Sequence, residues 1–199
     1  MNRLFAVVPA AGASRRMGQP KLLLPWGAST VIEHLLGALV HPRVVARCVV
    51  VRPGDAPLAE AVTRAGARVI QPPFDPPEMK DSVLAALTAI ERDWHPEPDE
   101  GWVLTPADQP LLPPGILDPL VAAWDEGDAE VLIPRHSGRK GHPVLFRWSL
   151  LPEIRQLGPS EGLNAIVRKP GRRVQTIELD APGILVDVDT PDDYKRWQP

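Results

Sequence analysis

The sequence has little cysteine, no long apolar run and no excess of positive charge. Its single cysteine, Cys48, excludes a disulfide framework and a zinc site built on cysteine ligands. No uninterrupted apolar segment approaches the ~20 residues that span a bilayer, so we expect no membrane partner. The chain has 22 Lys and Arg residues and 25 Asp and Glu residues. The resulting net charge of −3 disfavours a nucleic-acid partner.

Proline and glycine are abundant but remain below the level typical of disorder. The chain has 25 prolines and 15 glycines in 199 residues, together about 20%, which is below the roughly 25–30% that marks low-complexity segments.

The N-terminus resembles a signal peptide, but its apolar core, residues 4–8, is too short for export. We therefore expect one globular domain over residues 1–199, in the cytoplasm, with residues 4–8 as a buried strand.

Short apolar runs alternate with segments of helical periodicity along the whole chain. We predict strands at 4–8, 44–51, 67–71, 102–105, 130–134, 142–147, 174–179 and 184–188, and helices at 31–39, 55–65, 82–94, 116–124, near Leu150 and Leu163, and from Pro191. This alternation predicts an α/β, Rossmann-like fold with a mostly parallel central sheet and helices on both faces. Ligands of such sheets bind outside the carboxyl ends of the strands, so the loops after the strands should carry the function.

The first of these loops, residues 9–25, has the composition of a polyphosphate cradle. Arg15, Arg16 and Lys21 supply positive charge, and small side chains allow phosphate oxygens to reach main-chain N–H groups. The spacing fits neither a Walker loop nor a dinucleotide fingerprint. A mobile surface loop with solvated arginines is an equally open interpretation. The small residues are Ala10, Ala11, Gly12, Ala13 and Ser14.

Aspartates follow two of the later predicted strands. Asp108 lies in a Pro-Ala-Asp-Gln-Pro loop, and Asp187 and Asp189 lie where the predicted 184–188 strand ends. Alternation along that strand would place Asp187 and Asp189 on one face. Carboxylates beside a phosphate loop suit Mg²⁺, with Mn²⁺ as a substitute. For Asp189 the alternative is a helix cap ahead of Pro191.

Four segments, taken together and in order, resemble the molybdenum-cofactor nucleotidyltransferases, with the cytidylyltransferase branch most similar. They read PAAGASRRMGQPKLLLPWG, PADQP, RKGHPVLF and DVDTPDDY and run from the first strand to the last helix. The resemblance implies a nucleotidyltransferase fold, a nucleoside triphosphate with Mg²⁺, and molybdopterin as the phosphate-bearing acceptor. It also implies a molybdoenzyme that receives the product as a candidate partner.

The resemblance assigns roles to single positions of this chain. Ala11, Gly12, Arg16 and Lys21 match the nucleotide-binding loop, Asp108 matches a metal aspartate, and Asp187 or Asp189 matches the second metal position. His142 and Pro143 match a Gly-His-Pro turn on the acceptor side. The chain departs from the family pattern at residues 78–82, Glu-Met-Lys-Asp-Ser. The resemblance therefore does not determine which nucleotide base the protein uses. Ser82 is expected either to cap its helix or to touch the nucleotide.

The expected reaction is attack of the acceptor phosphate on the α-phosphorus of the nucleotide, with pyrophosphate leaving. Because the nucleophile is already an anion, catalysis needs charge neutralisation and positioning, which we assign to Arg16, Lys21 and Asp108. The expected transfer is of CMP from CTP to molybdopterin. Guanylyl transfer to the same acceptor, a sugar-1-phosphate or other small-phosphate nucleotidyltransferase, and a non-catalytic nucleotide-binding regulator remain open alternatives.

Overall fold

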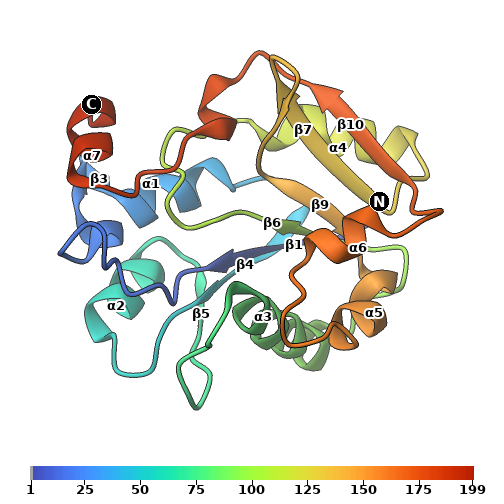
Figure 1. Cartoon of the computed structure of the whole chain (residues 1–199), viewed down its shortest axis with the longest axis horizontal. Helices are drawn as coiled ribbons and strands as arrows, with labels where there is room; N and C mark the ends of the chain where they lie inside the picture. Colours follow the sequence, from blue (N-terminus) through green and yellow to red (C-terminus); the bar gives the residue numbers. More distant parts are fainter. Residues whose placement is uncertain (1) are drawn as a thin grey trace.

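The apolar run near the N-terminus forms β1 (Leu4–Pro9), an inner strand of the sheet. The computed structural model describes residues 2–199, shown in Figure 1. β1 lies between β4 (Val44–Val50) and β6 (Gly101–Leu104), and both run parallel to it. Their carboxyl ends therefore lie at one edge, to which the loop after β1 also belongs.

The sheet has the strand order β10-β7-β9-β6-β1-β4-β5, with β8 paired to β7. The pairs among β1, β4, β5 and β6 are parallel, as is β7 with β10, whereas β9 runs antiparallel to β6 and β7. The prediction of a mostly parallel α/β sheet is confirmed. The remaining strands are β5 (Arg68–Ile70), β7 (Val131–His136), β8 (Arg139–Lys140), β9 (Val144–Arg147) and β10 (Val174–Glu178), and a separate hairpin of β2 (Pro25–Trp26) and β3 (Ser29–Thr30).

Alternate residues of β1 supply two hydrophobic cores, one on each face of the sheet. Leu4, Ala6 and Val8 pack in the core with α1, α2 and α4, whereas Phe5 and Val7 pack in the core with α3, α5 and α6. Helices thus cover both faces, as the sequence predicts. Their bounds are α1 (Val31–Ala38), α2 (Ala56–Arg64), α3 (Met79–Trp94), α4 (Leu117–Glu126), α5 (Leu151–Arg155) and α6 (Asn164–Arg168), with 3₁₀ turns η1 (Lys21–Leu23), η2 (Trp148–Leu150) and η3 (Pro182–Leu185).

The C-terminal helix, α7 (Pro191–Trp197), lies beside the N-terminal hairpin, as Figure 1 shows at the left of the view. Thr190 caps it, with its hydroxyl accepting the N–H of Asp193 at 3.2 Å. The Tyr194 hydroxyl donates to the carbonyl of Pro25 at 2.5 Å. This contact brings Asp189, just ahead of the cap, to the loop after β1. Among residues 2–199, no helix has the length and apolar character to cross a membrane.

The prediction of a strand over residues 184–188 is wrong. Pro182–Leu185 is a 3₁₀ turn, and the chain continues without a sheet partner. Its main chain instead rests against other loops: the N–H of Val188 donates to the carbonyl of Asp108 at 2.8 Å, and Gly183 is pressed against the carbonyl of Leu111. The strand argument for Asp187 and Asp189 sharing one face therefore fails.

Gly183 allows this close approach because it lacks a side chain. A Cβ at Gly183 would overlap the carbonyl oxygen of Leu111, whereas a Cβ at Gly37, in α1, would meet nothing within 4 Å. We expect Gly183→Ala to lower the free energy of unfolding by about 1–3 kcal/mol, the usual cost of overpacking. The matched control Gly37→Ala should be stabilising, because alanine is the better helix former. Urea unfolding curves of the two variants measure both effects, and equal midpoints would contradict the packing argument.

Candidate active site

A cavity of about 370 Å³ opens at the carboxyl ends of β1 and β6. The loop after β1, the segment entering α3 and the loop after β6 form its walls, and Asp189 borders it from the C-terminal segment. This is the position at which parallel sheets bind ligands. Of the residues singled out in the sequence, the lining includes Ala10, Ala11, Gly12, Ala13, Ser14, Arg16, Lys21, Ser82, Asp108 and Asp189; Asp187, His142 and Pro143 do not belong to it.

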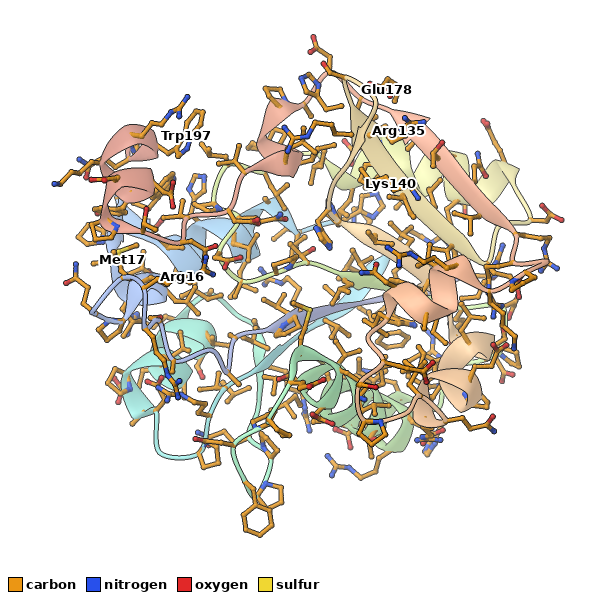
Figure 2. The ribbon with its side chains drawn as sticks, viewed as in Figure 1. Arg16, Met17, Arg135, Lys140, Glu178 and Trp197 are labelled. Atoms are coloured by element: carbon orange, nitrogen blue, oxygen red, sulfur yellow. The ribbon has the colours of Figure 1, made fainter. Side chains whose placement is uncertain are left out.

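The loop after β1 is shaped by Ser14 and anchored by Met17, which Figure 2 labels beside Arg16. Ser14 has a φ of 48°, and its carbonyl accepts the N–H groups of Met17 and Gly18. The side chain of Met17 is buried in the core. A Cβ at Gly12 would meet nothing within 4 Å. The small residues therefore leave the main chain of this loop open to the cavity, as a phosphate cradle requires.

Lys21 joins the loop to the two aspartates. Its ammonium Nζ lies 2.6 Å from Oδ2 of Asp108 and 2.8 Å from Oδ1 of Asp189. Burial by itself lowers the pKa of Lys21, but the hydrogen bonds and negative charges of Asp108 and then Asp189 outweigh it, so the pKa is raised. Lys21 is thus held charged between two carboxylates that are 87 and 168 residues away in sequence.

Arg16 reaches the same cluster from the solvent side. Its guanidinium lies 2.9 Å from Oδ2 of Asp189, and its side chain is 72% exposed. Asp189 therefore accepts Lys21 on one oxygen and Arg16 on the other. The exposed guanidinium can turn toward a ligand at little cost, because surface ion pairs contribute only about 0–1 kcal/mol.

Asp187 lies near the cluster but forms no ion pair with Lys21. Its Oδ1 accepts the amide of Gln109 at 2.8 Å, and Gln109 is almost fully buried. Burial raises the pKa of the Asp187 carboxyl, the Gln109 hydrogen bond opposes the rise, and the charges of Asp108 and Asp189 add to it. Of the two late aspartates, the structure brings Asp189 to Lys21 and directs Asp187 to Gln109.

His142 and Pro143 lie outside the cavity lining, at the turn before β9. The N–H of His142 donates to the carbonyl of Ile184 at 3.1 Å, which fixes the turn against η3. Burial lowers the pKa of His142 to about 4, although the negative charge of Asp108 acts in the opposite direction. The imidazole is therefore neutral at pH 7, and a contact of His142 with an acceptor phosphate stays a prediction.

Comparison with known proteins identifies the family. The model of the MobA-like NTP transferase domain matches residues 6–176. The chain belongs to this family. It is similar to the molybdenum cofactor cytidylyltransferase of Escherichia coli strain K12, with 25% identity covering 98% of this chain and 95% of that protein. It is 30% identical to a probable molybdenum cofactor guanylyltransferase of Mycolicibacterium paratuberculosis, covering 97% and 94%.

Solved structures give the same result for the fold. The structure of Rv0371c from Mycobacterium tuberculosis in complex with manganese is 25% identical, has a TM-score of 0.76 and covers 98% of both chains. This member of the MobA-like family is therefore an enzyme with the α/β nucleotidyltransferase fold. A nucleotidyltransferase requires a nucleoside triphosphate and a divalent metal ion.

Sequence reasoning missed two features, one in the lining of this cavity and one behind it. Pro76 and Pro77 line the cavity, but in the sequence they read only as breaks between elements. Gln109, which holds Asp187, stands next to Asp108 and could have been noticed as a polar residue between a functional aspartate and a proline. The prolines carry no such signal, because their contribution is the shape of the main chain.

The carboxylates at Lys21 have the chemistry of a magnesium site. Two carboxylates converge on one cation, the Lys21 ammonium, and Mg²⁺ is commonly held by one or two carboxylates together with substrate phosphates and waters. Within residues 2–199, no three His, Cys, Asp or Glu side chains are grouped to hold a metal ion on their own. Such a metal would therefore arrive with the nucleotide phosphates as further ligands.

The depressed pKa of His142 predicts how stability depends on pH. Between pH 6.5 and about 4, the unfolded chain protonates this imidazole and the folded chain does not, so stability falls as the pH is lowered. The loss is at most about 1.4 kcal/mol per pH unit. His142→Gln should remove it. Urea unfolding at pH 7 and pH 5 should show a smaller loss in the variant, whereas equal losses would contradict the assignment.

Proposed function

We propose that this chain is a magnesium-dependent nucleotidyltransferase that moves CMP from CTP onto the phosphate of molybdopterin, with release of pyrophosphate. Two curated relatives that match nearly the whole chain, with names that specify cytidylyl and guanylyl transfer in molybdenum cofactor synthesis, support the acceptor. GTP is the second candidate donor on the same grounds. The product would pass to a molybdoenzyme.

The single observation that carries the chemistry is the cluster of Lys21, Asp108 and Asp189 at one side of the cavity. Transfer between two phosphates brings several negative charges together, and a cation fixed in advance stabilises them without reorganisation. The acceptor phosphate is anionic at pH 7, so no general base is required. One oxygen of this phosphate forms a bond to the α-phosphorus, and the bond from the α-phosphorus to the departing pyrophosphate breaks.

The residues of the loop after β1 hold the triphosphate. Residues 10–14 line the cavity with small side chains, which would let phosphate oxygens reach their main chain, and Arg16 can turn from Asp189 to the β- and γ-phosphates. Lys21 would likewise turn from the aspartates to the phosphates, where its ammonium would stabilise the charge that accumulates on the departing pyrophosphate. Asp108 and Asp189, released by Lys21, would hold Mg²⁺, which neutralises charge on the reacting phosphates when bound.

Removing either partner of the central ion pair should abolish most of the activity. We expect Lys21→Ala and Asp108→Ala each to lower turnover by roughly 100-fold or more, the scale of losing one preorganised electrostatic group. The control is Lys169→Ala, which removes an exposed lysine that pairs with Glu153 on the surface. Pyrophosphate release under saturating Mg²⁺ is the measurement, and near-normal turnover in either site variant would refute its assigned role.

The identity of the donor and acceptor is tested in the same assay. Purified protein and Mg²⁺ are supplied with each of the four nucleoside triphosphates and with molybdopterin or a sugar 1-phosphate. Pyrophosphate release with CTP and molybdopterin alone supports the proposal. Release with GTP and molybdopterin would identify GTP as the donor in place of CTP. Release with a sugar phosphate would identify that sugar phosphate as the acceptor in place of molybdopterin. Nucleotide binding without any release would indicate a non-catalytic regulator.

A further inference from the structure

The loop after β6 and the segment before α7 are joined at two consecutive positions. The main-chain N–H of Val188 donates to the carbonyl of Asp108 at 2.8 Å. At the next residue of the loop, the side-chain amide Nε2 of Gln109 donates to Oδ1 of Asp187 at 2.8 Å. Because two neighbouring contacts restrain the direction of a segment as well as its position, they determine where the chain leads as it reaches Asp189.

Gln109 is a buried polar residue with an unpaired atom. It is 2% exposed. Within residues 2–199, its carbonyl oxygen Oε1 is buried and has no hydrogen-bond partner. Such an atom destabilises a fold, because it has lost its water and gained no partner. The hydrogen bond to Asp187 is therefore what this glutamine contributes, since an apolar side chain of the same length would fill the space without the unpaired oxygen.

Asp187 needs to be held, because it competes with Asp189 for the same cation. Asp187 is exposed, yet it lies close enough to the cluster that the charges of Asp108, Asp189 and Lys21 all act on its pKa. The segment that carries both aspartates has no sheet partner, so either carboxylate could face Lys21 if the segment turned. With the Gln109 amide on Asp187, Asp189 is the one that pairs with Lys21, at 2.8 Å.

We propose that Gln109 is a positioning residue for nucleotidyl transfer: by holding Asp187, it keeps the carboxylate of Asp189 beside that of Asp108. The inference rests on the proposed function, in which Asp108 and Asp189 bind the divalent metal ion. Gln109 does not line the cavity, so its effect passes through the segment that it holds. Removing a partner that orients a metal-binding carboxylate typically costs roughly 10–100-fold in metal affinity or activity.

The variant Gln109→Met tests this role, because methionine is also unbranched and of similar length but lacks both the amide donor and the unpaired oxygen. Mn²⁺ binding is measured without nucleotide by electron paramagnetic resonance, in a Lys21→Met background that frees the two carboxylates of their ammonium partner. We expect Gln109→Met to lower the Mn²⁺ affinity of this background by about tenfold or more. In the otherwise wild-type chain, turnover with CTP and molybdopterin should fall by a similar factor.

Stability separates positioning from a merely structural role. Gln109→Met should leave the urea midpoint unchanged or raise it, because the unpaired oxygen is removed and water can hydrate the exposed Asp187. The matched control is Thr105→Val. Thr105 is fully buried directly after β6, its hydroxyl has no partner within residues 2–199, and it does not line the cavity. This control should also keep the midpoint, but it should leave Mn²⁺ affinity unchanged.

Substitutions at Asp187 test the same contact from its other side. Asp187→Asn keeps an oxygen that accepts the Gln109 amide, so Mn²⁺ affinity in the Lys21→Met background should stay within about threefold. Asp187→Ala removes the acceptor and should lower the affinity by about tenfold or more. Adding Gln109→Met to Asp187→Ala should cause little further loss, because both variants break one contact.

The outcomes separate this inference from the proposed function. Unchanged Mn²⁺ affinity in Gln109→Met overturns the role of Gln109 while nucleotidyl transfer stands. A loss of affinity accompanied by a lower urea midpoint overturns it too, because Gln109 would then be a structural residue. An equal loss in Asp187→Asn and Asp187→Ala would identify Asp187 as a direct metal ligand and overturn the inference. If adding Asp189→Asn to Lys21→Met leaves Mn²⁺ binding unchanged, the metal role in the proposed function fails, and this inference fails with it.

Discussion

The ion pairs of Lys21 with Asp108 and Asp189 are the constraint on which the site depends. They connect the loop after β1, the loop after β6 and the segment before α7, which are distant in sequence. The sheet places the loop after β1 beside the loop after β6, because β1 and β6 are parallel neighbours and both end at the same edge. The hydrogen bond from the N–H of Val188 to the carbonyl of Asp108 fixes the segment before α7 beside the loop after β6.

Arg16 completes the charge balance of this cluster. Two carboxylates alone would repel a triphosphate, and an unpaired lysine would be costly to bury. With Lys21 between the carboxylates and Arg16 on Asp189, two cations balance two carboxylates, and the Lys21 ammonium stays charged because its pKa is raised. In the proposed function, nucleotide binding would exchange these partners: the ammonium would move to phosphate oxygens, and the carboxylates would become available to a divalent metal that accompanies the nucleotide.

The sequence predicted the α/β fold well, because the fold depends on local patterns, whereas phosphate binding by the loop after β1 stays a prediction. Apolar runs such as 4–8 and the small residues that follow are readable in a single stretch of chain. The 184–188 segment was misassigned because its alternating residues resemble a strand, and nothing local shows that Gly183 is pressed against Leu111. For the same reason, the choice between Asp187 and Asp189 could not be made: it depends on Gln109 and Lys21, which the fold brings from far away.

The exchange of cations at Asp108 and Asp189 can be measured directly. Electron paramagnetic resonance with Mn²⁺, in the absence of nucleotide, reports how tightly the two carboxylates bind a divalent ion. Lys21→Met keeps the length of the side chain and removes the ammonium that occupies this position, so Mn²⁺ affinity should rise by about tenfold or more, the effect of losing one charge-assisted hydrogen-bonded competitor. Introducing Asp189→Asn into this variant should reverse the gain. Unchanged or weaker Mn²⁺ binding in Lys21→Met would contradict the account.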